Sequence, residues 1–356
     1  MKIVHVTQPV EAGVAKVVLD LARAQRAAGW EVHVVCPPHG WLPDQLSTIP
    51  WPATRSPGLS VLGETLRLHK ILRKLRPDVI HLHSSKAGLT GRLAVRGRTP
   101  TIFQPHLWSF RLSNGLLRRA CTRWEAFASR WTHQLVCVSD DELASGREAG
   151  VTAPAEVVCN GVDTTLLRPS DRTTARRRLN LPERPTAVCV GRLAAQKGQD
   201  LLLAAWPAVL ADVPDAQLVL VGDGPMRAVW QQDQESVLWW GQSDDVESFY
   251  GAADVVVLPS RAEGMALVPL EAMACGRSVV AFDVDGVRQS IGPAGALVAK
   301  EDVAALGQAL AARLAYPSLA DGEGRTGRRR AETLFDRARM TDQIITLVEK
   351  LEGDAR

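Results

Sequence analysis

Long hydrophobic runs are absent from this sequence, since no apolar stretch approaches the ~18 residues that a membrane-spanning helix needs. The opening segment, residues 1–6, has the composition of a β-strand and is too short for a secretory signal. No two of the six cysteines have the spacing of a metal or redox pair, and four stand inside apolar runs, at Cys36, Cys137, Cys159 and Cys189. These absences predict a cytoplasmic protein with reduced cysteines, peripheral to the inner face of the cytoplasmic membrane at most.

Histidine is missing from the second half of the chain, and charge is divided unevenly between the halves. Residues 1–165 carry 20 Lys and Arg against 13 Asp and Glu, whereas residues 166–356 carry 22 against 26. The basic first half predicts a domain that meets an anionic surface or substrate, with a chance imbalance as the alternative. We expect no nucleic-acid partner.

Strand-like and helix-like segments alternate along the whole chain, which predicts an α/β fold with parallel sheets. With 356 residues, 46% of them hydrophobic, two domains are expected. We place an N-terminal domain at 1–165, a C-terminal domain at 166–335, and at 336–356 a helix that crosses back to the N-terminal domain. We interpret the proline-punctuated stretch 168–185 as a linker and hinge, and the charged stretch 321–330 as flexible.

The most informative stretch is an apolar strand at 255–258, followed by a polar turn and a helix predicted at 265–275. The first turn of such a helix has unpaired backbone N–H groups and a positive dipole end, and Gly264 lets a ligand approach the main chain. The stretch therefore predicts a phosphate site bracketed by Glu263 and Glu271. The alternative is an ordinary strand-loop-helix unit with one capping and one exposed glutamate.

Two cations follow the strand predicted at 186–190. Arg192 stands at the carboxyl end of that strand, and Lys197 stands one loop later, each beside a glycine. Since open α/β sheets bind ligands at this edge, the two cations suit a diphosphate; a solvated loop pair is the alternative. Gly13 opens a helix after the first strand and marks a weaker anion site.

Three further polar groups are weaker candidates. His106 follows a strand of the first half and belongs to a loop at the carboxyl edge. His81 and His83 alternate with Leu82 within a strand, which favours a structural role. Asp283-Val284-Asp285 resembles a metal-binding Asp-x-Asp but precedes a glycine, so a plain turn explains it better. We therefore predict no metal site.

The second half carries three motifs that resemble those of the retaining GT-B glycosyltransferases of family 4. In the family's order and spacing they are Gly191-Arg192-Leu193…Lys197-Gly198, the stretch 219–225, and Pro259-Ser260-Arg261-x-Glu263-Gly264…Glu271-Ala272-Met273-Ala274-x-Gly276. The first half matches more loosely, at residues 13–22, 29–32 and 160–163. The resemblance covers nearly the whole chain and implies two doubly wound Rossmann-like domains facing across a cleft.

By that resemblance, Arg192 and Lys197 bind the diphosphate of a nucleotide diphosphate sugar, Glu271 binds its ribose, and Glu263 holds the transferred sugar. The start of the following helix supplies further donor contacts from Gly264, Met265, Ala266 and Leu267. His106 and Gly13 complete the site from across the cleft. The family pattern is broken at Ala12, Met265-Ala266, Arg277-Ser278 and Asp285, which leaves the donor sugar and the acceptor geometry open.

The implied activity is retaining sugar transfer to a hydroxyl, in cell-surface polysaccharide or glycolipid synthesis, without a cofactor. Two alternatives stay open: a GT-B-shaped sugar-nucleotide epimerase or phosphorylase, and a catalytically silent scaffold of a polysaccharide assembly complex. The intact charged residues argue against the scaffold.

The stretch 107–124 alternates arginines with Trp, Phe and Leu. On a helix, Leu116, Ala120 and Trp124 share one face, and Arg119 and Arg123 share a neighbouring one. This pattern predicts binding to an anionic membrane surface, where a lipid-linked glycan acceptor would present its diphosphate. The alternative is an amphipathic helix that packs on the sheet with a solvated basic face.

Overall fold

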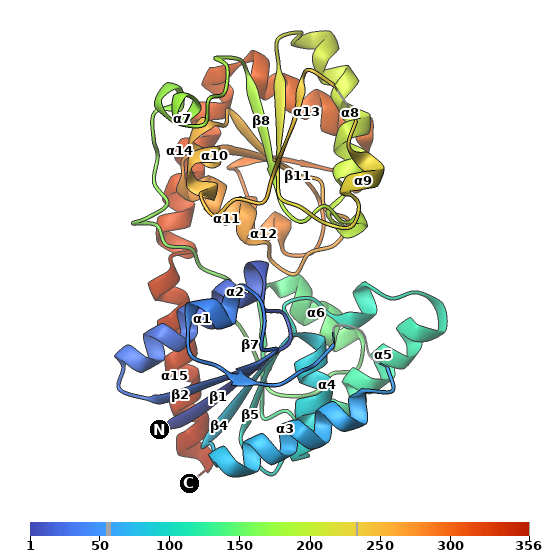
Figure 1. Cartoon of the computed structure of the whole chain (residues 1–356), viewed down its shortest axis with the longest axis vertical. Helices are drawn as coiled ribbons and strands as arrows, with labels where there is room; N and C mark the ends of the chain where they lie inside the picture. The colour runs from blue at the N-terminus through green and yellow to red at the C-terminus, as the bar shows by residue number, and fades with distance from the viewer. Residues whose placement is uncertain (55–57, 233, 356) are drawn as a thin grey trace. The chain divides into compact units, whose positions relative to one another are not determined.

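The computed structural model describes residues 1–54, 58–232 and 234–355. The chain divides into two compact units (Figure 1). The first contains Met1–Asn160 together with the terminal helix α15 (Arg337–Ala355), and the second contains Gly161–Asp336. Arg356, the last residue of the expected terminal segment, lies outside the described residues. None of the described helices is both long and apolar enough to cross a membrane.

The first unit is built on a parallel sheet, seven-stranded within the described residues, in the order β3-β2-β1-β4-β5-β6-β7. Its strands are β1 (Lys2–Thr7), β2 (Glu31–Cys36), β3 (Ile49–Pro50), β4 (Val79–His83), β5 (Thr101–Gln104), β6 (Gln134–Cys137) and β7 (Ala155–Val157). Helices α1 (Ala12–Ala27) and α15 cover one face, and α3 (Val61–Leu75) and α4 (Ser84–Val95) cover the other (Figure 1). The strand order reverses between β1 and β4.

The second unit repeats this plan with a parallel sheet in the order β10-β9-β8-β11-β12-β13, six-stranded in the described part of the chain. Its strands are β8 (Thr186–Val190), β9 (Gln217–Val221), β10 (Val237–Gly241), β11 (Val255–Leu258), β12 (Ser278–Phe282) and β13 (Gly295–Val298). One face packs on α8 (Gln199–Asp212) and α13 (Val303–Ala315). The other face packs on α10 (Val246–Ala252), α11 (Leu267–Ala274) and α14 (Pro317–Leu334). The order reverses between β8 and β11.

The expectation of a flexible segment at 321–330 is wrong, because these residues lie within α14. The glycines that suggested flexibility serve close packing instead. A Cβ on Gly324 would lie 2.1 Å from the Gly276 carbonyl oxygen, and one on Gly327 would lie 2.8 Å from the Met273 side chain. The helix therefore approaches α11 and the loop after it more closely than any larger residue allows.

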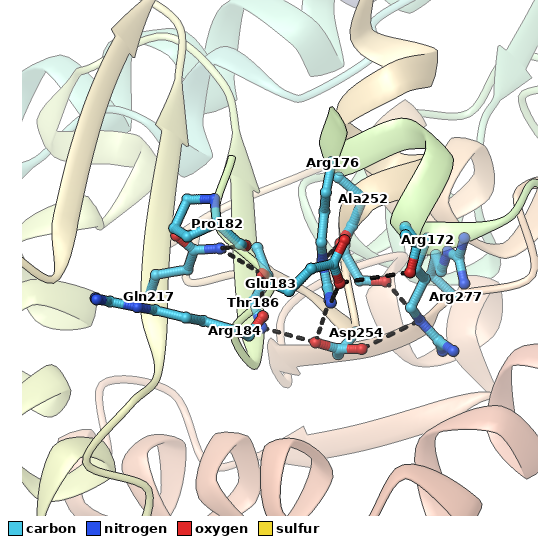
Figure 2. Close-up of polar contacts among 12 residues, drawn as sticks. Arg172, Arg176, Pro182, Glu183, Arg184, Thr186, Gln217, Ala252, Asp254 and Arg277 are labelled. Atoms are coloured by element: carbon cyan, nitrogen blue, oxygen red, sulfur yellow. Dashed lines mark hydrogen bonds and ion pairs between the residues drawn. The ribbon is translucent and has the colours of Figure 1, made fainter. Parts of the chain in front are cut away.

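The linker interpretation of residues 168–185 is also wrong, because this stretch contains helix α7 (Arg172–Arg178) and belongs to the second unit. Asp254, which precedes β11, holds it in place (Figure 2). The Asp254 carboxylate accepts from Arg176 Nη2 at 2.6 Å and from the Thr186 backbone N–H at 2.7 Å, and it pairs with Arg172 Nε at 3.1 Å. Arg176 also donates to the Ala252 carbonyl. The stretch is rich in Arg and Pro, as a solvated linker would be, yet the guanidinium groups of Arg172 and Arg176 bind acceptors of the second unit.

We expect Asp254→Ala to lower the free energy of unfolding by about 3 kcal/mol, because it leaves the buried Arg176 guanidinium with only the exposed Glu183 as a carboxylate partner. Arg178→Ala is the matched control, since its ion pair with Asp245 is exposed and should contribute no more than about 0.5 kcal/mol. Urea titration of both variants measures the difference. Equal losses in the two variants would show that Asp254 does not anchor α7.

Candidate functional site

The candidate site of the second unit lies where its strand order reverses. From β8 the chain builds β9 and β10 on one side and then returns to place β11 on the other. The loops that follow β8 and β11 therefore start next to each other at the carboxyl edge of the sheet. Ligands of open α/β sheets bind at such a point. The residues predicted from sequence in this unit all lie on these two loops and on α11.

The loop after β8 and the loop after β11 are joined by direct hydrogen bonds. The Arg261 backbone N–H donates to the Gln196 carbonyl at 2.8 Å, and Gln196 Nε2 donates to the Ala262 carbonyl at 2.9 Å. The Arg261 guanidinium binds both carboxylate oxygens of Asp200, at 2.8 and 2.7 Å, and lowers the pKa of that carboxyl. The two loops thus form one rigid surface.

Glycine makes this contact between the loops sterically feasible. Gly198 has a φ of 70°, and a Cβ there would lie 1.9 Å from the Pro259 carbonyl oxygen. The loop after β9 packs in the same way, because a Cβ on Gly222 would lie 2.2 Å from the Gly191 carbonyl oxygen. The glycine-containing motifs noticed in the sequence are therefore the places where three loops touch backbone to backbone.

The structure brings Lys197 and Glu263 together. Lys197 Nζ lies 2.6 Å from Glu263 Oε1, and the Glu263 side chain is 8% exposed. An ammonium has three N–H donors, so two remain on Lys197 for an anionic ligand. Arg192 is exposed at the carboxyl end of β8, where its backbone carbonyl accepts from Gln199 Nε2. The ion pair was not expected from sequence, because 66 residues separate its partners along the chain.

Helix α11 begins at Leu267, two residues later than the sequence predicted. Met265 and Ala266 precede the helix and are buried, and the N-cap residue, Ala266, makes no side-chain cap. An uncapped first turn presents backbone N–H groups and the positive end of the helix dipole, the environment that favours a phosphate. Helix propensity could not place this boundary, because the buried apolar run continues on both sides of it.

Glu271 lies in the second turn of α11 and is 5% exposed. The Tyr250 hydroxyl donates to Glu271 Oε2 at 2.7 Å. Burial and the neighbouring carboxylate raise the pKa of Tyr250 well above its ordinary value, so the phenol keeps its proton at neutral pH. Glu271 is therefore held in one orientation by a permanent hydrogen-bond donor.

The loop that contains Asp283-Val284-Asp285 packs against the loop that follows β11. Asp283 pairs with Arg288, which is consistent with the turn interpretation. Gly286 has a φ of 73°, and a Cβ there would lie 1.7 Å from the Gly264 carbonyl oxygen. This loop thus packs directly on Gly264, the residue expected to let a ligand approach the main chain.

In the first unit, the predicted residues lie at the carboxyl edge of the central strands. Gly13 is in the first turn of α1, after β1, and His106 follows β5. Ala12, Ser84 and His106, which follow β1, β4 and β5, all have positive φ, at 59°, 68° and 60°. Such backbone costs on the order of 1–3 kcal/mol at a non-glycine residue and concentrates at functional sites. The sequence analysis did not single out Ser84 and noted Ala12 only as a break in the family pattern, since residue type does not mark this conformation.

The histidines of β4 are fully buried, as a structural role requires, but His83 is also connected to His106. His83 Nδ1 and His106 Nε2 are 3.1 Å apart. Burial lowers the pKa of His106 to about 3 and holds that of His83 well below its ordinary value, so both rings are neutral at physiological pH. His106 is therefore part of a hydrogen-bonded group.

Comparison with known proteins gives matches over most of the chain. Residues 12–166 match the family model Glycosyltransferase Family 4, and residues 184–315 match Glycosyl transferases group 1. The chain is 30% identical to the lipopolysaccharide core biosynthesis mannosyltransferase LpcC of Rhizobium leguminosarum bv. viciae, over 73% of this chain and 82% of the relative. It is 27% identical to the UDP-Gal:alpha-D-GlcNAc-diphosphoundecaprenol alpha-1,3-galactosyltransferase of Escherichia coli, over 80% of each. The crystal structure of Anabaena HepE in complex with UDP-glucose covers 98% of this chain with a TM-score of 0.84 and 21% identity.

These matches and the two doubly wound sheets define the class as GT-B glycosyltransferases. The chain belongs to glycosyltransferase family 4. The expected fold class and enzyme class are confirmed, and neither the epimerase nor the silent scaffold is favoured, because the relatives are glycosyltransferases.

We expect Gly198→Ala to weaken binding of a nucleotide sugar at least tenfold, because the added Cβ meets the Pro259 carbonyl and separates the two loops. Gly29→Ala is the matched control: Gly29 also has positive φ, at 82°, but no atom lies within 4 Å of a Cβ built there. Both variants carry a backbone cost of about 1 kcal/mol. Calorimetric titration with a nucleotide sugar tests this, and unchanged affinity in Gly198→Ala would mean that loop contact does not shape the site.

Proposed function

We propose that this chain transfers a sugar from a nucleotide diphosphate sugar to an acceptor hydroxyl with retention of configuration. The observation that carries the proposal is the Lys197–Glu263 ion pair at the reversal point of the second sheet, beside Arg192 and the uncapped start of α11. One part of this group is cationic and suits a diphosphate, and the other is anionic and suits the hydroxyl groups of a sugar. That UDP-glucose is bound in HepE supports a nucleotide sugar as the donor class.

In the proposed reaction, breaking the bond between the sugar and the diphosphate builds negative charge on the departing phosphate oxygen. Arg192, the two remaining N–H donors of Lys197 and the start of α11 stabilise that charge. The acceptor oxygen attacks from the face that the phosphate leaves, and the acceptor's proton goes to the departing phosphate. These groups perform the task that a divalent cation performs elsewhere, so we propose that the reaction needs neither metal nor cofactor.

The carboxylates take the remaining donor contacts in this proposal. Glu263 is fixed by Lys197 and accepts hydrogen bonds from the transferred sugar. Glu271 is fixed by Tyr250 and accepts from the ribose hydroxyls. The backbone of Gly264 to Leu267 lies between the two glutamates along the chain, in position for the diphosphate. His106 and Gly13 are the proposed contribution of the first unit.

For the acceptor we propose a lipid-linked glycan of the cell envelope. The E. coli relative is named for a diphosphoundecaprenol-linked sugar, and the Rhizobium relative for the lipopolysaccharide core. A sugar linked to a lipid by a diphosphate would be an anionic acceptor held at a membrane. The excess of Lys and Arg in residues 1–165 suits such an acceptor in the first unit.

We expect Arg192→Ala and Lys197→Ala each to lower kcat by about 10²-fold, the effect of one lost transition-state donor. Arg184→Ala is the matched control, because Arg184 lies at the opposite, amino end of β8. Turnover is measured at saturating donor in EDTA, so that no divalent cation replaces the lost charge, and melting curves verify that each variant is folded. Full turnover in both site variants would exclude the phosphate assignment.

Exposed side chains on α5 (Gly115–Ala128) support the proposed membrane contact. Leu116 is 82% exposed and Leu117 is 56% exposed, beside the exposed Arg118 and Arg119. Apolar side chains beside arginines on one surface suit the headgroup region of an anionic leaflet. Trp124 was predicted on the same face, but its ring packs against Phe127 and Trp131 and is half-buried. The membrane-facing part of α5 is thus its first half.

Helix α3 carries a second surface of this kind, which the sequence did not reveal. Leu62 and Leu66, one turn apart, are 75% and 63% exposed. Arg67 and Lys70 are exposed on the same helix. Of the residues of α3 (Val61–Leu75), only Glu64, Leu68 and Leu72 are buried. We propose that α3 and α5 both contact the membrane.

We expect salt-sensitive binding to vesicles that contain an anionic phospholipid, weakened at least tenfold by Arg118→Glu with Arg119→Glu, because each basic residue contributes about 1 kcal/mol near an anionic leaflet. The matched control is Arg325→Glu with Arg329→Glu, which changes the net charge equally on α14 of the second unit. Flotation at low and high salt measures binding, and donor affinity should stay unchanged in both. If both double variants bind as the parent protein does, a soluble acceptor is the better account.

A further inference from the structure

A buried polar cluster lies under α1, on the face of the first sheet that is otherwise apolar. Ile3 of β1 and Val79 of β4 belong to the core formed with α1 and α15. Two residues further along these strands, the same face carries His5 and His81, which are register partners, followed by His83. All three histidines are fully buried. Polar groups in such a place need hydrogen-bond partners or a function.

Two of the cluster's rings, the ring of His106 and one amide form a continuous hydrogen-bonded chain. Gln25 Oε1, from α1, lies 2.6 Å from His5 Nε2. His5 Nδ1 lies 3.0 Å from His83 Nε2, and His83 Nδ1 lies 3.1 Å from His106 Nε2. Gln25, His5 and His83 are buried, whereas His106 is partly exposed at the carboxyl edge of the sheet. We call these four residues the histidine chain.

The ring geometry is that of end-to-end imidazoles. The His5 and His83 ring centres are 5.2 Å apart with 26° between the ring planes, and those of His83 and His106 are 5.4 Å apart with 23°. In both pairs the centre separation exceeds the nitrogen–nitrogen distance by about two ring radii. The nitrogen–nitrogen contacts therefore lie along the lines that join the ring centres, as good hydrogen bonds require.

His81 stands outside this chain. Its ring stacks on His83 with centres 4.0 Å apart. The Gln104 carboxamide partly offsets the lowering of the His81 pKa by burial. Among the described residues, however, neither ring nitrogen of His81 has a partner at hydrogen-bond distance. Nitrogens of His5, His81 and His83 come within 4.8 Å of one another, as metal ligands can. However, both nitrogens of His5 and of His83 already face hydrogen-bond partners, which favours the chain over a metal ion.

The hydrogen bonds of the histidine chain all point the same way, because a neutral imidazole has one N–H and one lone pair. The Gln25 carbonyl oxygen only accepts, so His5 carries its proton on Nε2. His5 Nδ1 then accepts from His83 Nε2–H, and His83 Nδ1 accepts from His106 Nε2–H. The Nδ1 atom of His106 is left with its lone pair at the end of the chain.

Burial keeps the rings in the neutral form that this order needs. It lowers the pKa of His5 to about 4 and that of His106 to about 3, and it holds the pKa of His83 well below the ordinary value. The backbone of His106, at a φ of 60°, fixes the base of the side chain. Ring orientation and proton position at His106 are thus both set from inside the domain.

We propose that Gln25, His5 and His83 are positioning residues that hold His106 as the Nε2–H tautomer, so that its Nδ1 accepts a hydrogen bond from a substrate hydroxyl. The substrate part of this proposal rests on the proposed sugar transfer. The tautomer part is a property of the ligand-free protein.

The decisive variant is Gln25→Leu, which removes the acceptor at the far end of the histidine chain, separated from His106 by His5 and His83. Leucine suits the apolar surroundings of α1. The matched control is His81→Leu, a histidine of equal burial on the same strand as His83 but outside the chain. Protein labelled with ¹⁵N-histidine is examined without ligand, because the ¹⁵N shift separates a protonated ring nitrogen from a lone-pair nitrogen. Turnover and donor affinity are measured on the same samples.

We expect one tautomer at His106, protonated at Nε2, in the parent protein and in His81→Leu. In Gln25→Leu we expect a mixture of both tautomers and a kcat about 2- to 10-fold lower, the effect of one hydrogen bond, with donor affinity unchanged. A proton on Nδ1 in the parent protein, a single tautomer in Gln25→Leu, or a stoichiometric metal that is lost in His81→Leu would each overturn the chain. A mixture of tautomers in Gln25→Leu without any loss of kcat would exclude a role of the histidine chain in turnover. The tautomer measurement is independent of sugar transfer, so it tests the histidine chain even if the protein transfers no sugar.

Discussion

The site of the second unit depends on one steric constraint, the backbone contact between Gly198 and Pro259. Two loops can meet this closely only if one residue has no side chain and adopts positive φ. Once they meet, Arg261 closes on Asp200, and Lys197 reaches Glu263. A similar contact at Gly286 fixes the Gly264 loop. The charged groups of the site are therefore positioned by uncharged ones, which explains why glycine stands beside Arg192, Lys197 and Glu263 in the family motifs.

Both units bury charges in pairs, as Lys86 with Glu64 shows in the first, but the first unit also buries neutral polar groups. The second unit buries charges in pairs, such as Lys197 with Glu263 and Arg176 with Asp254, so that each desolvated charge has a partner. The first unit buries histidines whose low pKa keeps them neutral, and it connects them by hydrogen bonds. A buried neutral histidine needs no ionic partner, so hydrogen bonds to its ring nitrogens are enough.

Much of the fold could be predicted from the sequence because strands in parallel sheets are continuous apolar runs. The strands β8 and β11 have the bounds predicted from the sequence, 186–190 and 255–258. Two predictions were wrong because a composition rich in arginine, proline or glycine was taken to mean a solvent-exposed, irregular segment. Arg176 and Arg172 made residues 168–185 look like a linker, and Gly324 and Gly327 made 321–330 look flexible. In both places, the deciding partner lies far along the chain, at Asp254 and at Gly276, and no local pattern records it.

The sequence by itself determined which residue types stand at the carboxyl edge: Arg192, Lys197, Glu263 and Glu271 in one half and His106 in the other. It could do so because strand ends and glycine motifs are local features. Only the tertiary structure decided that Lys197 pairs with Glu263, that Tyr250 holds Glu271, and that His106 ends a chain beginning at Gln25. Lys197 and Glu263 are 66 residues apart along the sequence, and Tyr250 and Glu271 are 21 apart. Such partners meet because parallel crossovers bring distant strands side by side.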